Sequence, residues 1–168
     1  MRLIVNRFLP LIILLAAFSM AVGSCKKSSN NNSSSGSMTA SINSTAWSAN
    51  YGVGGSFTVA DSMFDVAGAQ ITSGDTSGFS MTFYTPITIN KAYGSDTASI
   101  DIQYQDAKTG TLYDGGALAG HSTLTITSYN TSNFTIGGTF SGVLYNVSTG
   151  KDSLTVTGGT FSTTFTLQ

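Results

Sequence analysis

The sequence has 168 residues, enough for about one domain. Only 9% of the residues are charged, the formal net charge is −1, and all eight acidic residues are Asp. This balance excludes a basic nucleic-acid binder, and the single cysteine excludes a disulfide scaffold. The 25 Ser and 24 Thr, together with Val, Ile, Phe and Tyr, suit half-buried strands, and the lack of Glu argues against substantial helix.

The first 24 residues have the organisation of an export signal. Arg2 and Arg7 supply a positively charged start, and an apolar run follows over residues 8–22. This run of 15 residues is shorter than the roughly 20 that a membrane-spanning helix needs, and Pro10 lies near its start. We therefore predict a cleaved signal peptide over residues 1–24, with a retained membrane anchor as the alternative.

Residues 22–25, Val-Gly-Ser-Cys, resemble the lipobox of bacterial lipoproteins. The resemblance implies cleavage before Cys25, attachment of lipid to its sulfur, and acylation of the new amino terminus with a fatty acid such as palmitate. Cys25 is the only cysteine, so it has no partner for an intramolecular disulfide. Each buried methylene contributes about 0.8 kcal/mol to membrane binding, so several acyl chains would hold the protein firmly. A free cysteine behind an ordinary signal is the alternative.

Residues 25–37 comprise this cysteine and a Ser/Asn-rich tether. Such a segment cannot bury apolar surface, so we expect it to be flexible and to span roughly 20 Å. Lys26 follows Cys25 in place of the Asp that retains enterobacterial lipoproteins in the inner membrane, which implies transfer to the outer membrane. Residues 27–37 also lack the acidic patch that resembles a surface-export signal, so the periplasmic face is favoured over the cell surface.

Residues 38–168 are predicted to form a single all-β domain. No segment keeps the apolar spacing of a helix, whereas alternation recurs; in the clearest strand Ile100, Ile102 and Tyr104 face one side. Turn-forming runs lie at residues 73–78, 106–110, 130–133 and 148–151. The nine predicted strands cover residues 39–42, 45–49, 56–60, 63–72, 79–84, 98–105, 123–127, 133–147 and 152–167. This spacing predicts an antiparallel β-sandwich, with a flattened barrel as the alternative.

The pentapeptide Gly-Gly-Thr-Phe-Ser occurs twice, at residues 137–141 and 158–162. Two copies are too few for a repeat architecture. Across the second glycine pair the apolar positions change parity, from Val156 to Phe161 and Phe165, as a β-bulge would produce. We predict that the glycine pairs mark bends in neighbouring strands, and not a phosphate site, because no helix follows them.

A family resemblance covers most of residues 38–168. Residues 38–49, Met-Thr-Ala-Ser-Ile-Asn-Ser-Thr-Ala-Trp-Ser-Ala, resemble the opening of small lipoproteins that are common in Bacteroidetes and are grouped as a domain of unknown function. The later motifs also follow that group's order: Leu-Thr-Ile-Thr at 124–127, then Gly-Thr-Phe-Ser at 138–141 and 159–162. Ser44 stands where the group usually has glycine. The resemblance implies a β-rich envelope domain with no known activity.

The sequence predicts neither an enzyme nor a cofactor. The only histidine, His121, adjoins Ser122, but neighbours on a strand face opposite sides, so adjacency gives no Ser–His pair. No His or Cys set suits zinc, and no metal ligands are assigned. Asp106 with Thr109, and residues 114–116 (Asp-Gly-Gly), offer oxygen ligands for calcium, but neither has the spacing of a calcium loop. Whether a structural calcium is bound stays open.

Two functions remain. The first is a structural or accessory envelope protein that is anchored in the membrane by lipid and binds a partner protein. The second is a glycan-binding module whose candidate stacking residues are Trp47, Tyr84 and Tyr129. Tyr84 and Tyr129 lie on the outward parity of their strands, whereas core packing is the simpler interpretation of Trp47. Three rings in one exposed groove would favour the second function, and buried rings the first.

Three Asp-Ser/Thr-apolar tripeptides resemble the O-glycosylation acceptor of the same phylum. Their hydroxyl residues are Ser62, Thr97 and Ser153. We expect each at the junction of a turn and a strand, where a bulky glycan is tolerated.

Overall fold

The computed structural model describes residues 36–168 except 98, 107 and 117–119. The predicted signal peptide, Cys25 and most of the tether lie outside the described residues. Within the described part of the chain, no helix has the length and apolar content needed to cross a membrane.

The described chain is all-β, which confirms the predicted class. Its elements are β1 Ser37–Ile42, β2 Thr45–Ser48, β3 Tyr51–Thr58, β4 Met63–Thr72, β5 Asp75–Tyr84, β6 Ala92–Gly94, the 3-10 helix η1 Ser95–Thr97, β7 Ile100–Asp106, β8 Thr111–Asp114, β9 His121–Asn130, β10 Thr135–Asn146 and β11 Ser153–Leu167. The sequence did not predict β6 and β8, because three or four residues are too few to show a clear alternation.

The predicted six-residue loop at 73–78 is wrong. A two-residue turn joins β4 to β5, and Thr72 pairs directly with Asp75. Ser73 and Gly74 both have positive φ, 50° and 95°. Two-residue turns of this kind match the right-handed twist of the strands they join. Residues 75–78 therefore belong to β5.

All eleven strands belong to one hydrogen-bonded sheet with the order β2-β1-β11-β3-β4-β5-β7-β8-β10-β9-β6. Every pairing is antiparallel except the short parallel pairing of β11 with β3. Because β10 also pairs with β11, the seven strands from β11 to β10 in this order close into a ring. The predicted two-sheet sandwich is thus replaced by one mostly antiparallel sheet whose ring is not a clean barrel.

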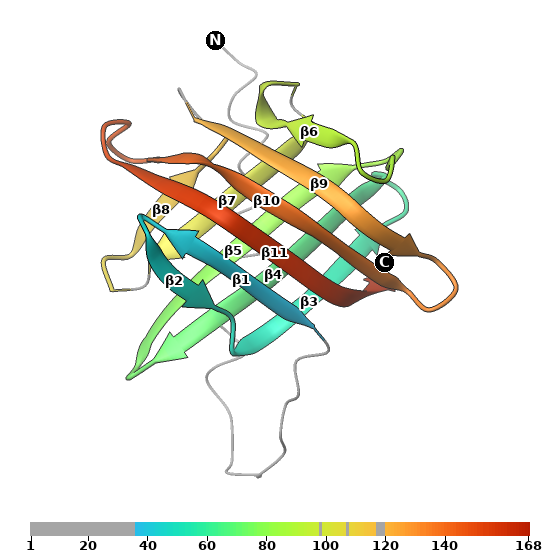
Figure 1. Ribbon diagram of the computed structural model, residues 1–168, viewed down its shortest axis with the longest axis horizontal. Helices are drawn as coiled ribbons and strands as arrows, with labels where there is room; N and C mark the ends of the chain where they lie inside the picture. The colour runs from blue at the N-terminus through green and yellow to red at the C-terminus, as the bar shows by residue number, and fades with distance from the viewer. Residues whose placement is uncertain (1–35, 98, 107, 117–119) are drawn as a thin grey trace. The chain divides into compact units, whose positions relative to one another are not determined.

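Two layers of this sheet enclose the core. Figure 1 shows β9, β10, β11 and β1 crossing in front of β3, β4, β5 and β7. Aromatic rings join the layers: the centroid of Phe64 on β4 lies 5.2 Å from that of Phe165 on β11 and 5.6 Å from that of Tyr129 on β9. Likewise Phe79 on β5 lies 5.2 Å from Phe140 on β10. Burial of these rings supplies much of the hydrophobic stabilisation of the domain.

The two Gly-Gly-Thr-Phe-Ser segments lie opposite each other on β10 and β11. In this register Gly138 faces Phe161, and Phe140 faces Gly159. A Cβ atom at Gly138 would stand 2.9 Å from the Phe161 ring, and one at Gly159 would stand 2.7 Å from the Phe140 ring. Such short approaches are too close for a real side chain, so each glycine leaves room for the ring of the opposite copy. In the folded domain, a glycine of each copy therefore makes room for the phenylalanine of the other copy.

The predicted bends at the glycine pairs are confirmed as β-bulges. Between β10 and β11 the register shifts from Phe140–Gly159 to Gly142–Val156, beside Gly158 with φ 59°. Between β9 and β10 it shifts at Gly137 and Gly138, where Thr127 is the extra residue on β9. A bulge changes the face that the following side chains occupy.

We predict that Phe64→Ala lowers the free energy of unfolding by about 3–5 kcal/mol, because a large buried side chain is removed from the core. Phe64 has no exposed surface and contacts the rings of Phe57, Phe83, Tyr129 and Phe165. Urea unfolding of the full chain, followed by Trp47 fluorescence, measures the change.

Tyr84→Ala is the matched control, since its ring is 46% exposed. It is expected to cost less than about 1 kcal/mol. Equal losses in the two variants would contradict the assignment of Phe64 to the centre of the core.

Candidate functional site

Trp47 lies in the core and not on the surface. Its side chain is 4% exposed, and its ring meets that of Phe79 edge to face at a centroid distance of 4.9 Å. The indole Nε1 donates a hydrogen bond of 2.9 Å to Ser77 Oγ. Trp47 therefore presents no free ring face, and its candidacy as a stacking residue is corrected.

Tyr129 also faces inward, contrary to the parity of its strand. Its ring lies edge to face with Phe64 and stacks with Phe165 at 5.9 Å. The bulge at Thr127 shifts the alternation of β9 by one residue, and this turns Tyr129 toward the core. Of the three predicted stacking residues only Tyr84 is exposed, so the three do not form a common platform.

The three candidate O-glycosylation residues are all exposed. Ser62 lies in the turn before β4 with φ 53°, Thr97 ends η1, and Ser153 begins β11. Thr97 Oγ1 donates a hydrogen bond of 2.8 Å to the carbonyl of Gly94. The positions meet the accessibility that a glycan requires, and the modification itself stays a prediction.

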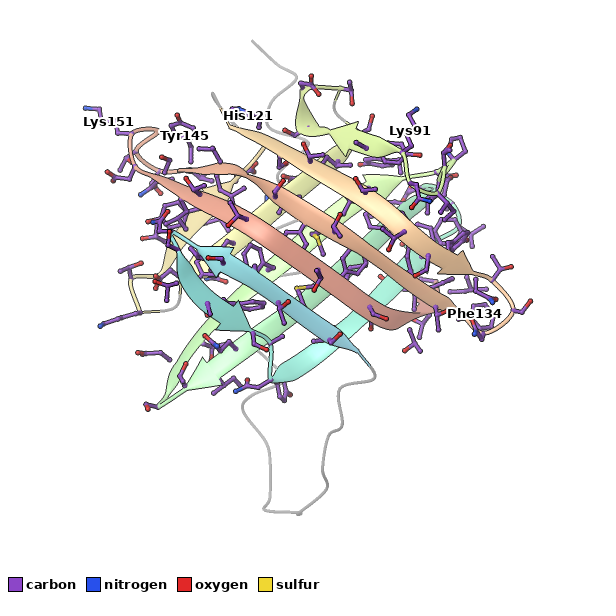
Figure 2. The ribbon with its side chains drawn as sticks, viewed as in Figure 1. Lys91, His121, Phe134, Tyr145 and Lys151 are labelled. Atoms are coloured by element: carbon purple, nitrogen blue, oxygen red, sulfur yellow. The ribbon has the colours of Figure 1, made fainter. Side chains whose placement is uncertain are left out.

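His121 and its neighbour Ser122 do not form a catalytic pair. Its side chain is exposed at the start of β9, while that of Ser122 is buried, so the two face opposite sides of the strand. In Figure 2 His121 lies near one end of the domain, far across the view from Phe134. Among the described residues, no group of three or more His, Cys, Asp and Glu side chains converges as a metal site would.

A row of hydroxyl side chains crosses the outer face of the front layer. Thr125, Thr139, Thr160, Thr39 and Ser48 pair in turn across β9, β10, β11, β1 and β2. The Oγ1 atoms of Thr39 and Thr160 lie 2.9 Å apart. An open depression of about 270 Å³ lies on this row, lined by Thr123, Thr125, Thr139, Phe140, Ser141, Gly158, Gly159 and Thr160. Its lining carries no charge and offers hydroxyl groups to a neutral ligand.

Exposed apolar side chains gather at one end of the ring. Val59 is 58% exposed, Leu167 56% and Phe134 42%. Val59 N donates to the carbonyl of Gln168, next to Leu167, and Phe165 N donates to the carbonyl of Phe134. These bonds bring the end of β3, the end of β11 and the turn between β9 and β10 together, near the label of Phe134 in Figure 2. We call Val59, Phe134 and Leu167 the apolar end.

Two carboxyl groups and an amide form a polar cluster on the other side of the sheet from the core. Asp101 and Gln103 alternate with the core residues of β7, and Asp114 of β8 pairs with Gln103. Gln103 Nε2 donates to Oδ2 of Asp101 and to Oδ2 of Asp114, both at 3.0 Å. Gln103 is 3% exposed and Asp114 5%. We call Asp101, Gln103 and Asp114 the carboxyl cluster.

Burial, together with the nearby charge of Asp114, raises the pKa of Asp101 from its ordinary 3.8 to about 7. The hydrogen bond from Gln103 acts in the opposite direction and is weaker. Asp101 Oδ1 receives no hydrogen bond, and a hydrogen bond between the carboxyl groups of Asp101 and Asp114 requires a proton on one of them.

Sequence reasoning identified Asp114 with its two glycines as a source of oxygen ligands but missed Asp101 and Gln103. Alternation placed these two residues together on one face of their strand. Their approach to Asp114 depends on the pairing of β7 with β8, and β8 was not predicted.

We predict that, in EDTA, the free energy of unfolding rises as the pH falls from about 8 to about 5. Folded Asp101 keeps its proton up to about pH 7, whereas the unfolded chain releases it near the ordinary pKa of 3.8. The folded state therefore binds more protons in this window. The resulting stability is complete below the unfolded pKa and is lost as the pH rises through 7. Urea unfolding at a series of pH values measures the slope.

Asp101→Asn is expected to flatten this profile, and Asp75→Asn, at the exposed start of β5, is the matched control. A wild-type stability that increases from pH 5 to pH 8 would mean that Asp101 is not protonated in the folded state.

Comparisons with protein-family models, with curated proteins and with solved structures find no match for this chain. Its function therefore has to be inferred from its own residues.

Proposed function

We propose that the protein is a lipid-anchored, non-catalytic component of the outer membrane whose β domain binds a partner protein. The apolar end carries this proposal. Val59, Phe134 and Leu167 are each between 42% and 58% exposed and come from three separate segments of the chain. Exposed apolar side chains that gather at one place are typical of sites that bind other proteins.

The partner is expected to offer an apolar, preferably aromatic, surface. Phe134 contacts the buried ring of Phe165 at 5.6 Å, edge to face, so one side of Phe134 is held by the core while the other faces solvent. A ring anchored in this way loses little conformational freedom when a partner covers it. Aromatic side chains of this kind often supply much of the binding energy of an interface.

The positions of the polar residues support a non-catalytic role. His121 is exposed at a strand end, and the side chain of Asp114 is only 5% exposed. A catalytic acid or base has to reach its substrate, and the carboxyl group of Asp114 is covered.

The anchor is proposed on the sequence of residues 22–25, which lie outside the described residues. The relationship to the Bacteroidetes lipoproteins is likewise a proposal, and the all-β domain is in keeping with it. The periplasmic face of the outer membrane is the proposed location, because residues 27–37 carry no acidic export patch.

Cys25→Ser is expected to abolish lipid attachment, because the sulfur of Cys25 is the proposed acceptor. Metabolic labelling with an alkyne fatty acid should mark the wild type and not the variant, and the variant should leave the membrane fraction. Ser24→Ala, which keeps a small residue before the cysteine, is the control and should still be labelled. Labelling of Cys25→Ser at the wild-type level would remove the proposed anchor.

A photo-crosslinking amino acid at position 134 is expected to capture one envelope protein in intact cells. Leu167→Ser in the same chain should abolish this product, because it removes apolar contact area next to the probe. The same probe at position 51, where Tyr51 is 39% exposed on β3, is the matched control and should not give the product. Identical products from both probes, or none from position 134, would contradict docking at the apolar end.

The hydroxyl row favours a second candidate, a module that binds a neutral glycan. The depression around Thr139 and Thr160 offers hydroxyl groups and no charge, although no aromatic platform accompanies it. Retention of the protein by a neutral polysaccharide that is lost in Thr139→Val, and kept in Leu167→Ser, would support this candidate over the first.

A further inference from the structure

Unpartnered polar atoms are concentrated at one place in the domain. Among the described residues, three buried side-chain oxygens have no hydrogen-bond partner: Asp101 Oδ1, Gln103 Oε1 and Ser122 Oγ. All three surround residues 114–116. Gln103 pairs with Asp114. Asp101 Oδ1 lies 3.4 Å from the position that a Cβ of Gly116 would occupy. Ser122 Oγ lies 2.8 Å from the position that a Cβ of Gly115 would occupy. Buried polar atoms are almost always satisfied, so this concentration indicates a missing ligand.

Two oxygen atoms of the carboxyl cluster receive no hydrogen bond. Gln103 Nε2 donates to both carboxyl groups, and the backbone N–H of Gly116 donates to Asp114 Oδ1 at 2.6 Å, but Asp101 Oδ1 and Gln103 Oε1 are left without a donor. A proton on Asp101 would satisfy Asp101 Oδ1 but would leave Gln103 Oε1, on a side chain that is 3% exposed, without a donor. A cation, by contrast, accepts several oxygen ligands at once and also offsets the negative charge.

Two carboxyl oxygens converge beside Gly116. The Oδ1 atoms of Asp101 and Asp114 lie 3.4 Å and 3.5 Å from the position that a Cβ of Gly116 would occupy. The φ angle of Gly116 is outside the positive region, so its backbone conformation does not require glycine. Both carboxyl groups therefore approach Gly116 on the side where a side chain would stand.

We propose that the carboxyl cluster is a calcium site, in which Asp101 and Asp114 bind Ca²⁺ beside Gly116 and Gln103 holds both carboxyl groups in place. Calcium binds oxygen ligands in variable geometry and completes its shell with amide oxygens, carbonyl groups and water. Magnesium requires near-ideal octahedral geometry at shorter distances, which a site with two carboxyl groups and an amide on different strands matches less well. Two carboxylates neutralise the charge of one Ca²⁺.

The site lies where β8 completes the ring. β8 pairs with β10 at Tyr145–Asp114 and Asn146–Tyr113, and Val147 N donates to the carbonyl of Leu112 just beyond these pairs. Ser95 of η1 donates to the carbonyl of Gly115 and accepts from Ser122 N, so the same segment also contacts η1 and β9. An ion bound by Asp101 and Asp114 would hold the end of β8 against β7, next to the residues through which β8 pairs with β10.

The test is thermal unfolding of the full chain, purified in detergent and freed of metal, in increasing CaCl₂ at constant ionic strength. The unfolding midpoint should rise once the concentration passes a Kd of about 10⁻⁴–10⁻³ M, the range of extracellular calcium modules. MgCl₂ should need an at least roughly tenfold higher concentration for the same shift. An unfolding midpoint of the wild type that stays unchanged up to about 10 mM CaCl₂, or that responds equally to MgCl₂, overturns the proposal. This outcome does not depend on any variant.

Two variants and one control locate the ion. Gly116→Ala keeps every charge, and its Cβ would make only ordinary contacts at 3.4 Å and 3.5 Å, so the variant should fold but bind calcium at least about tenfold more weakly. Asp101→Asn should abolish the calcium response. Asp65→Asn removes a carboxyl group that is hydrogen-bonded to Thr82 outside the cluster, and should respond as the wild type does. Wild-type calcium affinity in Gly116→Ala would overturn the proposed position of the ion.

Discussion

The reciprocal fit of two glycines and two phenylalanines across β10 and β11 is the constraint on which the rest of the domain depends. Gly138 accommodates Phe161, and Gly159 accommodates Phe140, so the two strands can approach while both rings enter the core. The exposed fractions of Phe140 and Phe161 are only 3% and 4%. The pairing of β10 with β11 closes the ring. A side chain at either glycine would therefore disrupt this pairing.

The bulges of the front layer decide which residues face inward. At Thr127 the alternation of β9 shifts, and Tyr129 enters the core beside Phe64. At Gly158 the alternation of β11 shifts, and Thr160 joins the hydroxyl row while Phe161 is buried. Both the aromatic core and the uncharged outer face therefore result from the same local irregularities, and a strand without them would mix the two faces.

The carboxyl cluster and the apolar end depart in opposite ways from the usual distribution of side chains. Polar atoms of Asp101 and Gln103 are buried without partners, while Phe134 and Leu167 leave large apolar areas in solvent. Each arrangement costs stability unless something else completes it. In our proposals, a cation completes the carboxyl cluster and the surface of a partner protein covers the apolar end. The two sites are formed by different strands, so either can be occupied without the other.

The sequence by itself determined the all-β class, the extent of β4 and the bends at the glycine pairs, because alternation and glycine pairs report on burial within a single strand. The lipid attachment at Cys25 is likewise a prediction from linear sequence. Only the tertiary structure decided that Tyr129 packs against the core and that Asp101, Gln103 and Asp114 meet. These outcomes depend on which strands pair and in which register, and β8, which completes the carboxyl cluster, is too short to be recognised alone. Pairing is a property of two segments and their shared core, so the pattern of one segment cannot specify it.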